Sequence, residues 1–373
     1  MNLLNISGVS SENHQSKVVN AMRFPLITLV VLFHLYPPEE EITSSFTSYN
    51  IISTFFSAHG IARLAVPTFF LISGYFFYYH LKEWNKSVYI IKLRKRINTL
   101  FIPYILWNGL PILGIITARW LTGMTNGSSL SMIKEFGDSI SWERAFWDCG
   151  TIKGHPFDVP LWYIRDLMVC SICSPLIYYF IKRTGLLYIL LIGCLYLTNT
   201  WLNIAGFDSR AWLFFSIGAY LSLNNINMVC MLHRYTIFII PIAIALLVIT
   251  TYYNNALTSI QPILNNLFLL FGVTSLIGGI SYLVRKGLVR NVPFLTKSVF
   301  FIYAFHMLPL PGISSITALC KNIIGRSIVE TQVLTYFVQL VMCPIMVLCA
   351  CLAIFYIMHR FTPKLLSVIT GQR

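Results

Sequence analysis

Apolar runs of about twenty residues, separated by short polar segments, recur along the whole chain. An α-helix of that length crosses the hydrocarbon core of a bilayer, because it rises about 1.5 Å per residue across about 30 Å. The pattern therefore predicts an all-α polytopic membrane protein with about ten transmembrane helices. The expected helix centres are Leu29, Phe70, Ile112, Cys170, Cys194, Ser216, Ala243, Leu270, Ala304 and Val347.

Composition and charge agree with this fold class. Apolar residues make up 56% of the chain and charged residues 11%, whereas about a quarter of a soluble domain is charged. The net charge of +14 would also suit a nucleic-acid-binding protein, but the basic residues gather in alternate loops. By the positive-inside rule these loops face the cytoplasm, and both termini then lie there too. The basic loops are residues 82–96, 182–183, 234, 285–297 and 360–373.

The chain carries no other targeting, metal-binding or domain signal. Its first twenty residues are polar and its first apolar run has full length, so we expect an uncleaved anchor rather than a signal peptide. None of the nine cysteines has the spacing of a metal site. Residues 1–373 are therefore expected to form a single integral-membrane domain with no appended soluble domain and no bound metal.

The first apolar run, MRFPLITLVVLFHLYPP at residues 22–38, contains two ionisable residues. Arg23 and His34 project from one face of a helix, roughly 16 Å apart along its axis. We expect the helix to begin at Arg23, with Pro25 in its first turn. It would then present a cation near one membrane surface and an imidazole inside the membrane. Such a histidine is a candidate functional residue, although one satisfied by a neighbouring hydroxyl or carbonyl fits as well.

The basic loop 82–96 is a second candidate site. Its KLRKR segment holds Arg94, Lys95 and Arg96 and leads directly into the third apolar run. A basic run at a membrane face commonly anchors to anionic lipid. The same side chains also bind the phosphates of an anionic cofactor. The sequence leaves both interpretations open.

Charged residues in later runs are further candidates. Arg63 lies at the outer edge of the second run, either as a snorkelling interfacial arginine or as a cation lining an outer cavity. Arg165 and Asp166 are neighbours in the fourth run and point about 100° apart on a helix. We therefore expect that they do not simply neutralise each other. Asp166 is either a structural brace or part of an acceptor site.

The outer loop at residues 142–163, WERAFWDCGTIKGHPFDVPLWY, mixes aromatic and acidic residues. Trp162 and its aromatic neighbours fit a belt at the membrane interface. Rings beside carboxylates are also what a carbohydrate-binding surface uses, because rings stack on C–H faces and carboxylates accept hydroxyl groups. This loop is therefore a candidate acceptor site.

Several segments occur in the same order as in a known family. They are Arg23 and His34 in the first run, AVPTFFLISGYFF (65–77), LRKRINTLFIPYILWN (93–108), PLWYIRDLM (160–168), FFSIGAYL (214–221) and SVFFIYAFHM (298–307). On these segments the chain resembles the membrane-embedded acyltransferase 3 family. The resemblance implies a ten-span enzyme of the cell inner membrane. Such an enzyme moves an acyl group, commonly acetyl, from cytoplasmic acyl-CoA to an acceptor at the outer face, usually a carbohydrate.

The resemblance also implies roles for single residues. The family's first-span arginine and histidine correspond to Arg23 and His34. His306 matches a recurrent family position, for which a packing or interfacial histidine is the alternative. Many relatives carry two arginines three residues apart before the third span; here Arg96 fits the first position, but the second is Thr99.

Acyl transfer calls for the same residue types on chemical grounds. A base must take the hydroxyl proton, cations must hold the CoA phosphates, and donors must stabilise the oxyanion. The imidazole of His34 suits the first task, and Arg23 with the basic residues 94–96 suits the second. No residue in the sequence identifies itself as the oxyanion donor.

Two other classes of function compete with an enzyme. A transporter of a small polar or anionic solute also carries buried charges, but it commonly shows an internal repeat and acidic coupling residues. The sequence shows no repeat, and Asp166 is its one clearly intramembrane acid. A non-catalytic membrane scaffold would not need His34.

The alternation of basic loops makes the topology testable. A reporter fused after Arg96 is expected to lie in the cytoplasm, and one inserted at residues 127–137 is expected to lie outside. Paired phosphatase and fluorescent-protein fusions measure this directly. The reverse pattern would exclude transfer in the direction that the resemblance implies.

Overall fold

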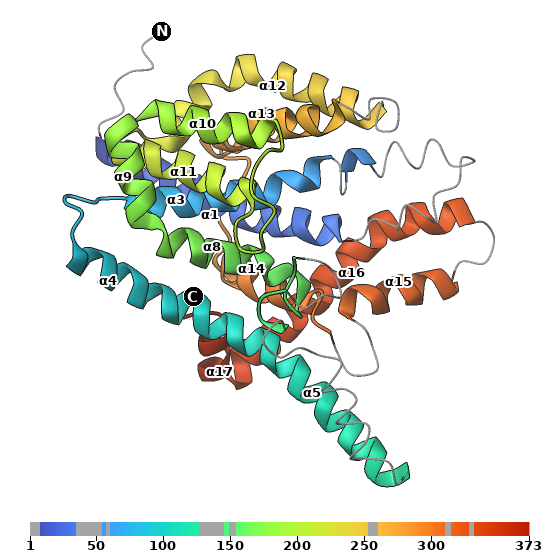
Figure 1. Ribbon diagram of the computed structural model, residues 1–373. Helices are drawn as coiled ribbons and strands as arrows, with labels where there is room; N and C mark the ends of the chain where they lie inside the picture. Colours follow the sequence, from blue (N-terminus) through green and yellow to red (C-terminus); the bar gives the residue numbers. More distant parts are fainter. Residues whose placement is uncertain are drawn as a thin grey trace. The chain divides into compact units, whose positions relative to one another are not determined.

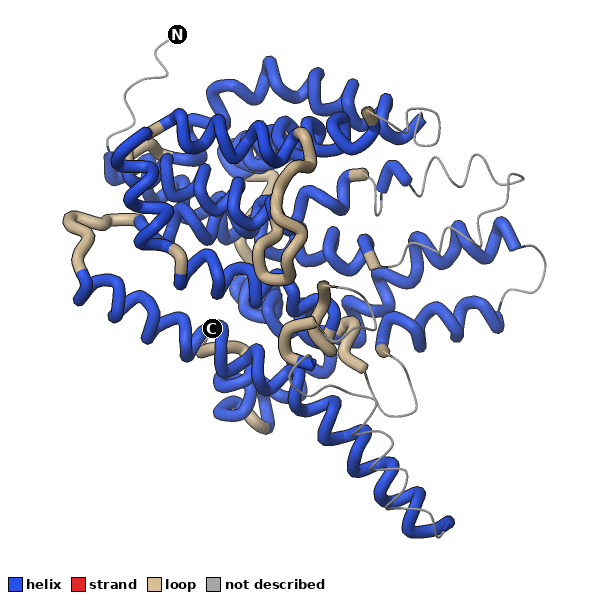
Figure 2. The backbone as a smooth tube through the Cα atoms, in the orientation of Figure 1, coloured by secondary structure: helices blue, strands red, loops and turns tan. Residues whose placement is uncertain are grey.

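The computed structural model describes residues 8–34, 54–56, 60–126, 145–148, 154–252, 260–309, 315–327 and 332–372. Within these ranges every regular element is a helix and there is no strand (Figure 2). The all-α class is therefore confirmed. Helices suit a bilayer because each satisfies its own backbone N–H and C=O groups within one segment.

The elements follow one another closely along the chain. Up to residue 172 they are α1 (Gly8–Phe33), η3 (Ile61–Leu64), α3 (Ala65–Tyr78), α4 (Lys86–Arg96), η4 (Ile97–Phe101), α5 (Ile102–Asn126), η5 (Val159–Leu161) and α8 (Trp162–Ile172). The others are α9 (Ser174–Thr184), α10 (Leu186–Leu197), α11 (Ser209–Leu223), α12 (Met228–Tyr252), α13 (Gln261–Arg285), α14 (Pro293–Phe305), α15 (Ile316–Ser327), α16 (Gln332–Phe361) and α17 (Pro363–Ile369). Elements η3 and η5 are 3₁₀ turns, and η4 is a π-helical turn.

Six helical segments in the described ranges are long and apolar enough to cross a membrane, and a seventh is added if α8 and α9, bent by 60°, form one span. The protein is thus a polytopic membrane protein. All ten predicted centres lie in helices, and three of these helices, α10, α11 and α14, lie outside the seven segments just counted. The number of ten spans and the cytoplasmic termini stay predictions. The six segments are Glu12–Phe33, Thr54–Tyr78, Lys86–Ala118, Met228–Tyr252, Gln261–Arg285 and Leu340–Phe361.

The first helix begins earlier than the sequence pattern predicts. α1 starts at Gly8, so Arg23 lies well inside it, and Pro25 is an internal residue rather than part of the first turn. The expectation that the helix begins at Arg23 is wrong. The reason is tertiary, because the polar first half of α1 packs on other helices: His14 Nε2 lies 3.0 Å from Ser281 Oγ on α13. A search for apolar runs does not detect a polar helical segment that is stabilised by packing on other helices.

The chain divides into two compact units, each assembled from separate stretches. Unit 1 comprises Met1–Asn85, Cys173–Leu202 and Ser209–Val299. Unit 2 comprises Lys86–Ile172, Asn203–Asp208 and Phe300–Arg373. Neither unit is a continuous half of the sequence, so both depend on contacts between distant segments.

Small residues bring helices of unit 1 into backbone contact. A Cβ added to Gly74 of α3 would lie 2.0 Å from the Phe215 carbonyl oxygen, and one added to Gly218 of α11 would lie 2.1 Å from the Leu71 carbonyl oxygen. Helices α3 and α11 therefore touch along their backbones, as small residues allow in membrane proteins. Helices α12 and α13 lie side by side in the same unit (Figure 1).

Unit 2 is closed by its last helix. Trp107 Nε1 on α5 donates to the Ile369 carbonyl oxygen on α17 at 2.8 Å. Gly371, with φ of +69°, ends α17 against η4, where an added Cβ would lie 2.6 Å from the Thr99 carbonyl oxygen. Only glycine combines this backbone angle with so close an approach. The C-terminal segment is thereby fixed on the π-helical turn.

We expect Gly218→Leu to destabilise unit 1, because the new side chain collides with the backbone of α3. Overpacking of this kind costs about 1–3 kcal/mol. Thermal unfolding of the purified protein in detergent measures the loss. Gly193→Leu is the matched control, since a Cβ added at Gly193 of α10 meets nothing within 4 Å. Equal unfolding temperatures for the two variants would contradict the close packing of α3 and α11.

Candidate functional site

A buried polar network lies at the start of α8 in unit 2. Pro160 lies in η5, and the helix that follows carries Arg165 and Asp166 in its first turns. Arg165 is 2% exposed and Asp166 is fully buried. Burying two ionisable groups costs free energy unless they pair and fill their hydrogen-bonding capacity. The network shows how this requirement is met.

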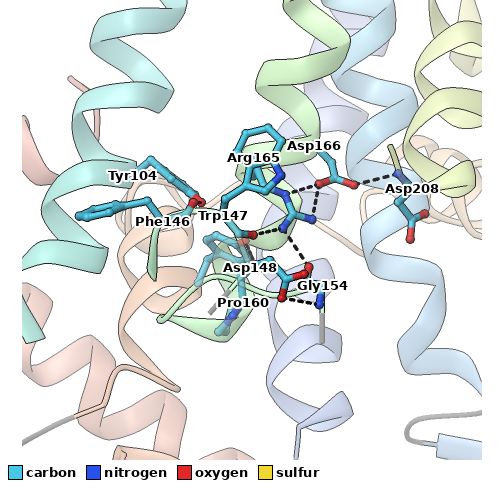
Figure 3. A network of polar contacts seen from close by, with 10 residues as sticks. Tyr104, Phe146, Trp147, Asp148, Gly154, Pro160, Arg165, Asp166 and Asp208 are labelled. Carbon is cyan, nitrogen blue, oxygen red and sulfur yellow. Dashed lines mark hydrogen bonds and ion pairs between the residues drawn. The ribbon is translucent and has the colours of Figure 1, made fainter. Parts of the chain in front are cut away.

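The Arg165 guanidinium contacts three residues (Figure 3). Its Nε and Nη2 contact Asp166 Oδ1 at 2.9 and 2.8 Å. Its Nη1 donates to the backbone carbonyl oxygens of Trp147, at 2.5 Å, and Gly154, at 2.9 Å. The guanidinium also lies over the Trp147 ring, 5.5 Å from the ring centroid. The planar, multi-donor shape of arginine makes this possible.

Asp166 completes the network on its other side. Its Oδ2 accepts the Asp208 backbone N–H at 3.1 Å (Figure 3). The expectation that Arg165 and Asp166 do not neutralise each other is wrong, because the long arginine side chain folds back onto its neighbour's carboxylate despite the angle between their Cβ directions. The pair fastens three segments, around residues 147, 154 and 208, to α8. This is the geometry of a structural brace.

The segment before α8 is held by further polar contacts within unit 2. The Tyr104 hydroxyl on α5 donates to the Phe146 carbonyl oxygen, and the Tyr303 hydroxyl on α14 donates to the Pro160 carbonyl oxygen. Asn108 Oδ1 accepts the Asp158 backbone N–H at 3.0 Å. These bonds hold residues 146, 158 and 160 against α5 and α14.

The predicted base and its arginine lie on α1 in unit 1. Arg23 is exposed, and His34, directly after the last residue of α1, is half-buried with its ring 5.2 Å from that of Phe33, edge to face. Arg63, also in unit 1, is half-buried in η3. The remaining predicted site residues belong to unit 2. A single site formed by His34 and the basic run stays a prediction.

The basic run lies at the end of α4. Arg94 and Lys95 are exposed, and half-buried Arg96 caps the π-helical turn η4. Thr99, which stands where many relatives have the second arginine, turns its hydroxyl back to the Lys95 carbonyl oxygen at 2.9 Å. It therefore adds no charge to the run. π-Helical turns are frequent at functional sites, and the sequence pattern did not predict this one.

Trp162 and His306 lie in different settings. Trp162 is half-buried, with its ring centroid 6.2 Å from that of His155. His306 is fully buried just after α14, and its Nδ1 lies 3.0 and 2.9 Å from the Ile302 and Tyr303 carbonyl oxygens. Because a carbonyl oxygen only accepts, Nδ1 carries the ring proton, and the lone pair of the neutral ring is on Nε2.

Asp158 lies in the loop 142–163 that the sequence marks as a candidate acceptor site, but the sequence did not predict its burial. It is fully buried, whereas its neighbours Phe157 and Val159 are half-buried. Burial raises the pKa of Asp158 well above its usual value. The sequence feature that could have indicated this burial is the position of Asp158, two residues before Pro160 and at the start of an apolar run. Among the residues that the structure describes, no group of three or more His, Cys, Asp or Glu could hold a metal ion.

The sequence model of the acyltransferase 3 family, described as an acyltransferase domain, matches residues 17–356. The chain belongs to this family. The matched range includes every predicted site residue from Arg23 to His306, so the resemblance seen in the motifs is confirmed. This membrane acyltransferase is 26% identical to the succinoglycan biosynthesis protein ExoH of Rhizobium meliloti (strain 1021). The similarity covers 95% of this chain and 92% of that protein. No solved structure matches the chain.

The ion pair between Arg165 and Asp166 leads to a prediction about the stability of the fold. Asp166→Ala leaves the Arg165 charge buried without its partner, which should cost about 3–5 kcal/mol. Asp148→Ala is the control, because it removes one carboxylate acceptor, at 2.9 Å from the Gly154 N–H, and should cost about 1 kcal/mol. Thermal unfolding in detergent compares the two. If Asp166→Ala were as stable as the wild type, the brace would be excluded.

Proposed function

We propose that the protein transfers an acyl group, with acetyl as the first candidate, from cytoplasmic acyl-CoA to a hydroxyl of an extracytoplasmic or membrane-linked carbohydrate. The observation that carries this proposal is the family match over residues 17–356. A relative named for succinoglycan biosynthesis, similar over nearly its whole length, supports a carbohydrate acceptor. The lipid bilayer is the protein's environment, and no nucleic acid takes part.

In this proposal His34 is the general base. Its imidazole takes the proton of the acceptor hydroxyl as the hydroxyl oxygen attacks the thioester carbonyl, and the CoA thiolate then leaves. Half-burial at the end of α1 supports the role, because the ring is held by packing and still has an accessible surface. Arg23 lies on the same helix, roughly 16 Å away along its axis, which is comparable to the reach of an extended pantetheine arm.

The donor is held by cations. Arg94 and Lys95 expose their side chains at the end of α4, where they are accessible to the phosphates of acyl-CoA, and Arg96 follows them. We assign these three residues, together with Arg23, to donor binding. No metal enters the reaction, because the cations meet the charge of the phosphates.

Acceptor contacts come from the other predicted residues. Arg63, Trp162 and His306 are proposed to line the acceptor site, and Arg165 with Asp166 to support it by fixing the loop before α8. Residues 1–373 act as one catalytic domain. The enzyme is placed in the cell inner membrane, with ten spans and both termini in the cytoplasm. Helices α10, α11 and α14 would supply the three spans beyond the seven segments that are long and apolar enough to cross a membrane.

His34→Gln tests the proposed chemistry most sharply. Glutamine keeps a hydrogen bond of similar length but does not accept the proton, so transfer from labelled acyl-CoA should fall at least about a hundredfold, while acyl-CoA binding and unfolding temperature stay unchanged. His34→Ala should be equally inactive and equally folded.

His233→Gln is the matched control, since His233 is also half-buried in unit 1 and its Nδ1 lies 3.2 Å from the Gly278 carbonyl oxygen. It should keep activity. Near-normal transfer by His34→Gln would exclude the general base. A wild type that moves a solute across vesicles without consuming acyl-CoA would identify a transporter instead.

A further inference from the structure

The Asp158 side chain is left without a partner in an otherwise satisfied region. Its backbone N–H donates to Asn108 Oδ1, and its backbone oxygen accepts the Leu161 N–H at 3.0 Å. The carboxyl itself is fully buried. Within the part of the chain that the structure describes, neither Oδ1 nor Oδ2 has a hydrogen-bond partner. The backbone of Asp158 is therefore held by hydrogen bonds, whereas its carboxyl makes none with the described residues.

The polar groups around Asp158 are committed elsewhere. Tyr104 and Tyr303 lie close enough to interact electrostatically with its carboxyl, but their hydroxyls donate to the carbonyl oxygens of Phe146 and Pro160. Asn108 Nδ2 donates to the Tyr104 carbonyl oxygen at 3.0 Å. None of these bonds leaves a donor directed at Asp158. Among the described residues, these groups therefore supply no partner for the carboxyl.

An unpartnered buried carboxyl lowers the stability of the fold. A polar group taken out of water without a hydrogen bond costs folding free energy, and a charged one costs more. Burial raises the pKa of Asp158, which favours the neutral carboxyl. A neutral carboxyl has one O–H donor and one C=O acceptor. Buried polar groups in proteins are almost always hydrogen-bonded, so an unpartnered carboxyl needs an explanation, and a bound ligand is one.

The chemistry of the surroundings selects the ligand. A neutral carboxyl beside two phenol oxygens offers nothing to attract a phosphate or carboxylate. A hydroxyl group both donates and accepts a hydrogen bond, so it can donate to the carboxyl C=O and accept from the carboxyl O–H. Aromatic rings are close by as well, since Tyr303 interacts electrostatically with the Asp158 carboxyl and its ring packs edge to face with that of Tyr163, 5.8 Å apart between centroids. A carbohydrate has hydroxyls for the carboxyl and C–H faces for the rings.

We propose that Asp158 is an acceptor-binding residue whose carboxyl exchanges two hydrogen bonds with a hydroxyl of the carbohydrate. This inference rests on the proposed function and assigns one contact within it. Asp158 belongs to unit 2, where the Arg165–Asp166 pair and the tyrosines hold the loop that carries it. The residue binds the acceptor and takes no part in proton transfer.

Two substitutions separate binding from structure. Asp158→Leu keeps the approximate volume and removes both hydrogen-bonding groups, whereas Asp158→Asn keeps one donor and one acceptor. The probe is the lipid-linked oligosaccharide fraction of the source organism, and equilibrium dialysis measures its binding to purified protein without acyl-CoA. Transfer from labelled acyl-CoA is measured separately. His233→Gln, which lies outside this loop on α12, is the control and should bind as the wild type does.

We expect Asp158→Leu to bind the oligosaccharide at least tenfold more weakly, with unchanged acyl-CoA binding and an unfolding temperature no lower than that of the wild type. Asp158→Asn should stay within about threefold of the wild type in binding, because the amide has equivalent groups. Unchanged binding by Asp158→Leu would overturn the inference. So would its unfolding at a lower temperature, since that would reveal a structural partner.

The binding measurement also separates this inference from the proposed function. If the wild type binds oligosaccharide and Asp158→Leu does not, but acyl-CoA is never consumed, the transfer reaction fails and the carbohydrate contact stands. If transfer occurs and Asp158→Leu binds normally, the reaction stands and the contact is overturned. A wild type that binds no oligosaccharide overturns the contact as well.

Discussion

The ion pair between Arg165 and Asp166 is the interaction on which unit 2 most depends. A guanidinium and a carboxylate are stable inside an apolar protein only when each is neutralised and hydrogen-bonded. Here the arginine uses its remaining N–H groups on two backbone carbonyls, and the aspartate uses its remaining oxygen on the Asp208 N–H. Three loop segments are held to one helix as a result. The same pair that would be unstable alone thus fixes the backbone at residues 147, 154 and 208.

Helix positions were largely predictable because the membrane imposes a local rule, which is that each span must be apolar and must satisfy its own backbone. All ten expected centres lie in helices for this reason. The start of α1 was not predictable, since residues 8–21 are polar and are stabilised by partners such as Ser281 on a distant helix. A prediction made from the hydrophobicity of one segment does not include contacts with a distant helix.

The candidate site was less predictable, and the reasons are physical. The pairing of Arg165 with Asp166 depends on the reach of a flexible side chain, which the angle between two helix positions does not give. The burial of Asp158 depends on Asn108, fifty residues away, and on Tyr303, more than a hundred residues away. Family membership supplied His34 and Arg23, whereas the orphaned carboxyl became visible only from the packed structure.

The contact between Gly371 and the Thr99 backbone has a consequence for how the protein is made. A ribosome adding about 5–20 residues per second delivers the π-helical turn roughly 15–50 seconds before it delivers the glycine that covers it. During that interval Arg96 and its basic neighbours lack their final surroundings while later helices are still being synthesised. The basic run at the end of α4 therefore reaches its final surroundings only after α17 has been made, so a chain truncated before α17 would leave the π-helical turn uncovered.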